Sequence, residues 1–139
     1  MTVGWREWVA LPELGIERIK VKVDTGARTS AIHAHDVRSV ERDGERYVQF
    51  KLNPVQLKRE VEIECEALII DERVVMDSGG HREQRYVIET PIVIGGETFP
   101  IEVTITRRDN MRFRMLLGRT AMAGRIVVDP MRSYLAGKL

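Results

Sequence analysis

A short motif, Asp24-Thr25-Gly26, has the residue types needed to present a carboxylate for acid-base chemistry. It follows the run Ile19 to Val23, whose alternating apolar and polar residues are typical of a half-buried strand. Because Gly26 permits a sharp turn, the Asp24 carboxylate would project from the end of that strand, with the Thr25 hydroxyl bracing the turn. Such a carboxylate can take a proton from a water molecule that attacks a substrate carbonyl.

This chemistry requires a second carboxylate, which holds a proton for the substrate carbonyl. Two acids about 3 Å apart share one proton, because they cannot both ionise cheaply. The chain carries one copy of the motif, and the simplest source of the second acid is Asp24 of another subunit across a two-fold axis. We therefore expect a homodimer. An acid of the same subunit, Asp77 or Asp109, is the alternative that the sequence leaves open.

The elements that must position this turn are mostly strands. Alternating runs at 46–52, 60–67 and 99–106 predict half-buried strands. Asp43-Gly44 predicts a tight turn that leads into the first of these strands, and Gly95-Gly96 predicts one between residues 90–94 and the last. One short helix is expected at 119–125, directly after Gly118. With 139 residues, the chain is expected to form a single domain over 1–139.

Composition excludes several partner classes. The chain is 43% hydrophobic and 31% charged with a net charge of +1, so no global field draws it to nucleic acid or to a membrane surface. The single cysteine, Cys65, lies in an alternating run and is expected to be buried. We also expect no signal peptide, no transmembrane segment and a cytoplasmic location.

Several motifs together resemble a known class of enzymes. The Asp24-Thr25-Gly26-Ala27 turn and the downstream Leu116-Leu117-Gly118-Arg119 resemble the retropepsin-like aspartic peptidases. Gly4 to Val9, with Lys22 to Ala34, is most similar to the bacterial family known as ATP-dependent zinc proteases. That family includes the partner protease of an ATP-grasp glutamate ligase that extends ribosomal protein S6.

The resemblance implies a mostly β fold, a closed retropepsin-like acid-protease barrel, and specific roles for several residues. Asp24 would be the catalytic residue, with Thr25 and Gly26 fixing its turn and the small Ala27 facing the substrate. The stretch 76–80 would form the tip of a flap over the bound peptide, where flexible residues allow bending and exclude water. The flap residues expected to contact substrate are Ser78, Gly79 and Gly80.

The chain departs from the viral enzymes at a position that bears on specificity. Where they place an acid that pairs with the later arginine, this chain has Arg28, which is expected near Arg119. Two arginines cannot pair, so their guanidinium groups are available to bind carboxylates. With Arg82 and Arg85 beyond the flap and His33 as a further contact, we expect an acidic peptide substrate. By the resemblance, this would be an oligoglutamate tail such as that of glutamylated ribosomal protein S6.

Two further hypotheses compete with an aspartic peptidase. The family's zinc label is weakly supported, because the candidate ligands are few; His33 and His35, two residues apart, would share one face of a strand. No phosphate-binding loop supports the ATP label. We therefore expect neither metal nor cofactor, while a metal-dependent peptidase and a non-catalytic peptide-binding module remain alternatives. The extra segment between His35 and Leu68, expected to be a hairpin, leaves the geometry of the dimer open.

Overall fold

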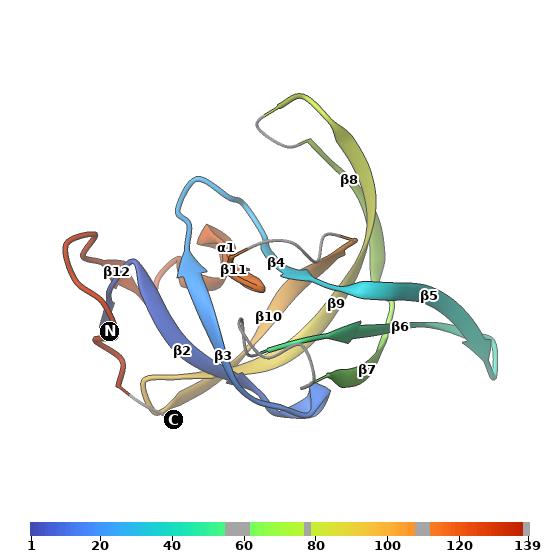
Figure 1. Ribbon diagram of the computed structural model, residues 1–139, viewed down its shortest axis with the longest axis horizontal. Coiled ribbons are helices and arrows are strands. Elements are labelled where there is room, and N and C mark those ends of the chain that lie inside the picture. The colour runs from blue at the N-terminus through green and yellow to red at the C-terminus, as the bar shows by residue number, and fades with distance from the viewer. Residues whose placement is uncertain (55–61, 77–78, 108–111, 138–139) are drawn as a thin grey trace.

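The computed structural model describes residues 1–54, 62–76, 79–107 and 112–137, and strands dominate it (Figure 1). The helical elements are a 3-10 helix, η1 (Pro12–Leu14), and a short α-helix, α1 (Arg119–Met122). The strands are β1 (Thr2–Val3), β2 (Arg6–Leu11), β3 (Ile16–Val23), β4 (Ser30–His33), β5 (His35–Arg42), β6 (Glu45–Leu52), β7 (Ile63–Leu68), β8 (Asp71–Met76), β9 (Arg82–Ile94), β10 (Glu97–Thr106), β11 (Met115–Leu117) and β12 (Val127–Val128).

The main sheet closes on itself. Among the described residues its strand order is β10-β4-β11-β3-β2-β9-β8, and β9 also pairs with β10. That additional pairing joins the two sides of the sheet into a ring, from which the β8–β9 hairpin projects at the top of Figure 1. The mostly β fold class with a closed sheet, predicted from sequence, is thereby confirmed.

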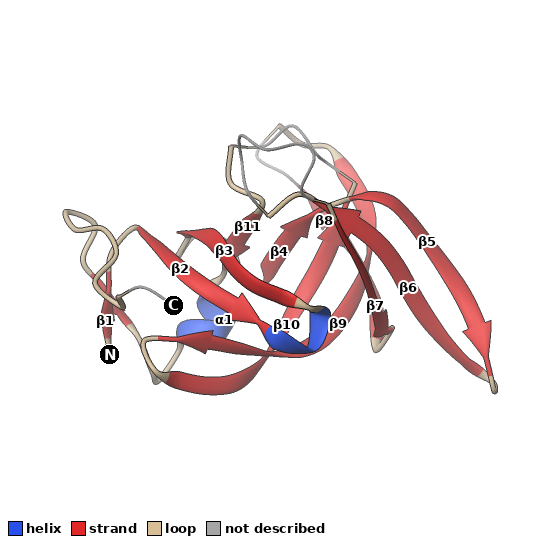
Figure 2. Ribbon diagram, turned by 60° about the horizontal axis from the view of Figure 1, so that its bottom comes forward, coloured by secondary structure: helices blue, strands red, loops and turns tan. Residues whose placement is uncertain are grey.

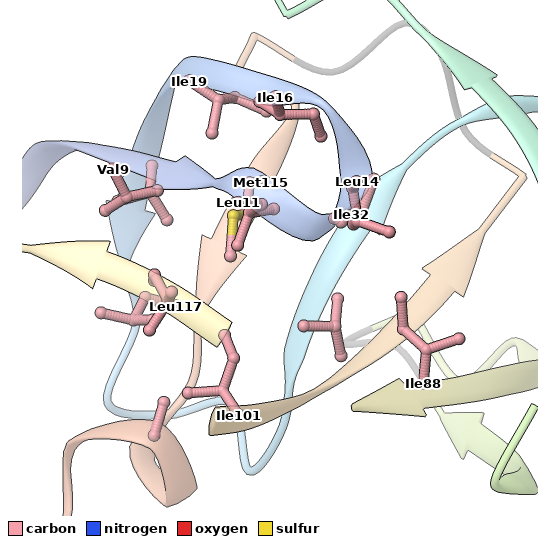
Figure 3. Packing of buried hydrophobic residues seen from close by; sticks show 14 of the residues in the cluster. Val9, Leu11, Leu14, Ile16, Ile19, Ile32, Ile88, Ile101, Met115 and Leu117 are labelled. Atoms are coloured by element: carbon pink, nitrogen blue, oxygen red, sulfur yellow. The ribbon is translucent and has the colours of Figure 1, made fainter. Parts of the chain in front are cut away.

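The ring encloses the apolar core because its strands alternate buried and outward-facing residues. In β2 every second residue is buried, which places Glu7, Val9 and Leu11 inside. The core combines residues from distant parts of the chain, among them Ile32, Met115 and Leu117 (Figure 3). Burying one such side chain stabilises the fold by about 1.5–3 kcal/mol, so the alternation strongly selects the register of each strand.

Strand β11 reaches the centre of the sheet by insertion between two strands that are consecutive in sequence. It runs parallel to β3, with Leu117 opposite Val23, and antiparallel to β4, with Met115 opposite Ile32. The connection from β3 to β4, residues 24–29, must therefore cross the end of β11. This crossing places the Asp24 turn over Gly118.

The extra segment between His35 and Leu68 forms a separate sheet rather than a simple hairpin. Strands β5, β6 and β7 pair antiparallel in that order and extend away from the ring (Figure 2). The chain leaves one sheet for the other between His33, the last residue of β4, and His35, the first residue of β5. The prediction that these two histidines share one face of a strand is therefore wrong, because a change of sheet separates them.

The C-terminal segment is docked onto β2. Glu7 is fully buried and its carboxylate accepts hydrogen bonds from the backbone N–H groups of Gly4, Leu135 and Ala136, at 2.6–3.0 Å. Tyr134 stacks on Trp8 with ring centroids 6.0 Å apart. These contacts satisfy the hydrogen-bonding groups of a buried carboxyl and tie residues 134–136 to the ring.

The remaining local predictions agree with the structure apart from two element boundaries. The strand predicted at 60–67 begins at Ile63 in β7, with residues 60–61 outside the described part of the chain, and the helix after Gly118 is shorter than predicted. Asp43 and Gly44, both at positive φ, connect β5 to β6, and Gly95-Gly96 connects β9 to β10. The short helix begins after Gly118 but ends at Met122, because Ala123 already has extended backbone angles.

Candidate active site

Asp24 begins a tight turn that its own side chain braces. Its carboxylate Oδ1 accepts a hydrogen bond from the Gly26 N–H at 3.0 Å, and its backbone carbonyl accepts from the Ala27 N–H at 3.2 Å. Its backbone N–H donates to the Leu117 carbonyl at 2.9 Å, which fastens the turn to β11. The Asp24 side chain is half-buried while Thr25, next to it, is exposed. A carboxylate so placed is held in orientation and remains accessible to water and substrate.

The end of β11 passes so close beneath this turn that position 118 must be glycine. A Cβ on Gly118 would lie 2.5 Å from the carbonyl carbon of Thr29 and 2.8 Å from the Ser30 nitrogen. The Gly118 N–H donates to the Ser30 hydroxyl at 3.0 Å, and the Arg119 N–H donates to the Ala27 carbonyl at 2.8 Å. The turn and the start of α1 are therefore locked together by main-chain contacts.

A groove of about 380 Å³ lies between this turn and the projecting hairpin. It borders the turn from Gly26 onward, so Asp24 stands beside it rather than in its lining. The described residues that line it come from the turn, from β8 and from the neighbouring strands: Gly26, Ala27, Arg28, Thr29, Ala31, Arg73, Val74, Val75, Met76, Arg85, Thr104 and Leu116. Backbone and apolar side chains with a few cations are suited to an extended peptide that carries acidic groups.

The structure brings Arg28 and Arg119 to the same turn, as expected from the sequence. The Arg28 carbonyl accepts a hydrogen bond at 3.0 Å from the N–H of Thr120, the residue that follows Arg119. Both side chains are exposed, and Arg119 Nη1 donates to the Gly26 carbonyl at 3.3 Å. Neither guanidinium forms an ion pair with a carboxylate in the described part of the chain. Both therefore retain donors for an acidic ligand.

Arg85 is a groove cation that is fixed in place. Its Nε lies 3.3 Å from Glu83 Oε2, its Nη1 lies 3.4 Å from the Thr104 hydroxyl, and its side chain is 11% exposed. Glu83 also accepts from the Thr106 hydroxyl at 2.9 Å and the Arg107 N–H at 3.1 Å. Partial burial raises the pKa of Glu83, but these donors and Arg85 together outweigh it, so the pKa lies below its ordinary value. Glu83 was missed from sequence, although its position two residues before Arg85 on one strand face was a usable signal.

We expect Glu83→Gln to lower the free energy of unfolding by about 1–2 kcal/mol at neutral pH, because charge-assisted hydrogen bonds are lost. Since folding lowers the pKa of Glu83, its contribution is present above the ordinary value of 4.5 and is lost as pH falls through the folded pKa. Urea unfolding at neutral and acidic pH measures this, and the difference from wild type should shrink in acid. Glu89→Gln, on the exposed face of the same strand, is the control; an equal loss there would contradict the assignment.

The other predicted contact residues that the structure describes lie outside the groove lining. Gly79 and Gly80 belong to the exposed connection between β8 and β9, and Arg82 begins β9 opposite Met76. His33 is buried at the end of β4, where it pairs in register with Thr106. Ser78 and the alternative acids Asp77 and Asp109 fall outside the described residues. The substrate-binding roles of these residues stay predictions.

A larger hollow, about 630 Å³, lies on the β5–β6–β7 sheet and shares no lining residue with the groove. Its charges are already balanced, since Arg42 pairs with Glu66 and Lys51 lies 3.5 Å from Glu64. Arg38 in the lining donates instead to the Gln49 amide oxygen at 2.9 Å. Because the lining holds as many carboxylates as cations, the hollow has no net charge that would select a ligand.

Two observations bear on metal chemistry. Cys65 is buried as predicted, its Sγ lies 3.3 Å from the Leu14 carbonyl, and burial raises the pKa of its thiol to about 12. It is therefore a poor thiolate ligand. Within the described ranges, no three His, Cys, Asp or Glu side chains come close enough to hold a metal ion. His33 and His35 in particular lie on strands of different sheets.

The closed ring, the inserted β11 and the braced aspartate turn define a retropepsin-like fold with an acid-protease type of turn. The family model described as "Retropepsin-like aspartic endopeptidase RimB" matches residues 2–139. The chain belongs to this RimB-like family.

Named relatives share sequence with this chain over only part of their own length. A "Probable alpha-L-glutamate ligase" of Shewanella pealeana is 46% identical over 136 residues, which cover 98% of this chain and 30% of the relative. A protein of the same name from Desulfotalea psychrophila is 42% identical over 137 residues, covering 99% and 30%. The chain thus spans about a third of the length of these relatives.

A crystal structure of a Legionella pneumophila protein of unknown function has the same fold. It superposes with a TM-score of 0.80 at 23% identity and covers 97% of both chains. Separately, none of the described helices is long and apolar enough to cross a membrane.

Proposed function

We propose that this chain is an aspartic peptidase that hydrolyses acidic, oligoglutamate-tailed peptides or proteins through water activated by Asp24. The observation that carries the proposal is the Asp24 turn itself. Its half-buried carboxylate is oriented by the Gly26 N–H, fastened to β11, and set beside a groove that contains cations. A structural turn has no need for an accessible carboxylate in this setting.

The second carboxylate is proposed to come from Asp24 of another copy of the chain. A two-fold axis through this exposed turn would place the two carboxylates together and let them share a proton. One would act as general base toward water while the other donates to the scissile carbonyl. The proposed active enzyme is a homodimer.

Two observations support an acidic substrate. Arg28 and Arg119 expose guanidinium groups that form no ion pair with described carboxylates, and such groups bind carboxylates in two-pronged geometry. The relatives named as glutamate ligases contain a region similar to this chain within a longer polypeptide. A peptidase joined to a ligase that adds glutamate would meet the glutamate product first. Glutamylated ribosomal protein S6 is accordingly the proposed partner.

Mass spectrometry of peptides with C-terminal oligoglutamate tests the proposal, with matched oligoglutamine peptides as controls. We expect the wild type to shorten the acidic tails alone, with or without a chelator, and Asp24→Asn to leave them intact. Loss of cleavage in the chelator would favour the metal-dependent peptidase. Binding of the acidic peptide with no cleavage by wild type would favour the non-catalytic binding module.

A further inference from the structure

A row of cations follows the outer face of β3 and leads away from the Asp24 turn. Lys20 and Lys22 alternate with the buried Val21 and Val23, and Arg18 continues the row next to the buried Ile19. Arg6 lies opposite Lys22 on β2. We refer to Arg6, Arg18, Lys20 and Lys22 as the β3 strip.

Aromatic rings hold three of these cations in place without neutralising them. The Arg18 guanidinium lies 3.9 Å from the centroid of the Trp8 ring, and the Lys20 ammonium lies 5.2 Å from it. Arg6 sits between Trp5 and Tyr134, at 4.7 Å and 5.0 Å from their ring centroids. Cation–π contacts restrict the side chains but leave their full charge. These three side chains are therefore ordered before any ligand arrives, which lowers the entropic cost of binding.

The charge of the strip is not balanced by carboxylates in the part of the chain that the structure describes. None of its four cations forms an ion pair with a described residue, whereas Arg42, Arg46, Lys51 and Arg73 elsewhere all do. Glu7, on β2 between Arg6 and Trp8, points into the core and is occupied by the C-terminal segment. The nearest carboxylate along β3 is that of Glu17, at the end distant from Asp24.

We propose that the β3 strip binds the part of an acidic polypeptide that extends beyond the catalytic aspartates. This inference rests on the proposed peptidase function and adds a second binding region for its substrate. Alternate residues of a strand are about 7 Å apart, and alternate side chains of an extended oligoglutamate have the same spacing. The strip begins at Lys22, two residues before Asp24, so one extended chain can occupy the groove and the strip together. Its carboxylates then meet successive cations.

The same contacts disfavour nucleic acid as the occupant. Single-stranded nucleic acids gain much of their affinity by stacking bases on open aromatic faces. The Trp8 ring is instead covered by Arg18 and stacked with Tyr134, with an interplanar angle of 18°. The strip thus offers charge without a stacking platform, which suits carboxylates on a flexible chain.

Binding of oligoglutamate peptides of different lengths tests this proposal. From Lys22 to Arg18 the strip spans about 13 Å. A peptide of about three glutamates therefore occupies only the groove beside Asp24, whereas one of about eight also reaches the strip. Affinities are measured by intrinsic fluorescence, because both tryptophans of the chain contact strip cations. The titrations use an Asp24→Asn background so that the peptides stay intact.

We expect the long peptide to bind about tenfold more tightly than the short one, and Arg18→Glu to remove that gain without changing binding of the short peptide. Arg125→Glu is the matched control, because Arg125 is also exposed and also lies over a ring, at 4.4 Å from the centroid of Phe99. The Arg125→Glu variant should change the affinities for the long and the short peptide by less than about twofold. Lys22→Gln, which removes no ring contact, guards against misfolding of Arg18→Glu and should reduce the gain in part.

Equal binding of the long peptide with and without Arg18→Glu would contradict the proposed role of the strip. Tighter binding of an RNA oligonucleotide of equal charge would contradict it as well. Failure of the peptidase proposal has a different signature: length-dependent binding through Arg18 with no cleavage by wild type. Conversely, if cleavage depended neither on tail length nor on Arg18, the peptidase proposal would stand and the substrate-binding role of the strip would be contradicted.

Discussion

Replacing Asp24 with Asn is expected to lower kcat on an oligoglutamate-tailed peptide by about a thousandfold or more. A general base contributes about a hundred- to ten-thousand-fold to the rate, and an amide cannot take a proton from water. Because Asn has nearly the same shape and keeps an oxygen that can accept from the Gly26 N–H, the turn itself should persist. Initial rates measured by mass spectrometry, together with unchanged urea unfolding, would separate lost chemistry from lost fold.

Asp43→Asn is the matched control for this change. Asp43 also lies in a turn, at a φ of 53° that Asn adopts readily, and it is exposed at the far hairpin of the β5–β6–β7 sheet. We expect its activity to equal that of wild type. An Asp24→Asn protein that retained most of its activity would remove Asp24 from the mechanism altogether.

Mixing subunits extends the same prediction to the source of the second carboxylate. If two copies of Asp24 form one site, excess Asp24→Asn protein should trap wild-type chains in mixed dimers and lower the activity of a fixed amount of wild type. Activity that is unaffected by the excess variant, and that survives dilution, would instead indicate an acid of the same subunit. Asp77 and Asp109, which fall outside the described residues, would then be the candidates to replace.

Gly118→Ala is expected to lower the free energy of unfolding by about 3 kcal/mol, because the added Cβ meets main chain rather than a flexible side chain. The added Cβ would lie 2.5 Å from the Thr29 carbonyl carbon and 2.8 Å from the Ser30 nitrogen. These clashes are relieved only if the turn moves away from β11. A shift of about 1 Å in a catalytic group can cost about a hundredfold in rate. Chemical unfolding and kcat should therefore fall together.

Gly44→Ala provides the comparison, since a Cβ there meets nothing within 4 Å. Its φ of +80° makes the substitution costly by about 1–2 kcal/mol for conformational reasons alone. We expect kcat to be unchanged in this variant. If Gly118→Ala lowered stability and activity no more than Gly44→Ala, the close contact of Gly118 with the main chain of Thr29 and Ser30 would be contradicted.

Much of the local structure could be predicted because it depends on neighbouring residues. The alternation in Glu45–Leu52 specifies a strand with one buried face, and Asp43-Gly44 specifies a tight turn through its tolerance of positive φ. The Asp24 turn is similarly encoded in three adjacent residues, and its bracing hydrogen bond spans only two positions. Burial of Cys65 followed from the alternation of its own run, 60–67.

Predictions that depended on which sheet a residue joins were less successful. The spacing of His33 and His35 indicated one strand face, but the chain changes sheets between them, and no local signal marks that change. The role of Glu7 was not predicted either. Its donors, Leu135 and Ala136, lie more than a hundred residues away, and a glutamate on a strand is usually exposed.

The sequence by itself thus determined a mostly β chain, the aspartate turn, the hairpins and the pair of arginines that departs from the viral pattern. Only the tertiary structure decided that β11 lies between β3 and β4, that Glu83 fixes Arg85 in the groove, and that the cations of β3 form no ion pair with a carboxylate of the described residues. The reason is physical. Turns and alternation arise from steric preferences and burial within a few residues, whereas strand insertion and charge balance depend on contacts between segments that are distant along the chain.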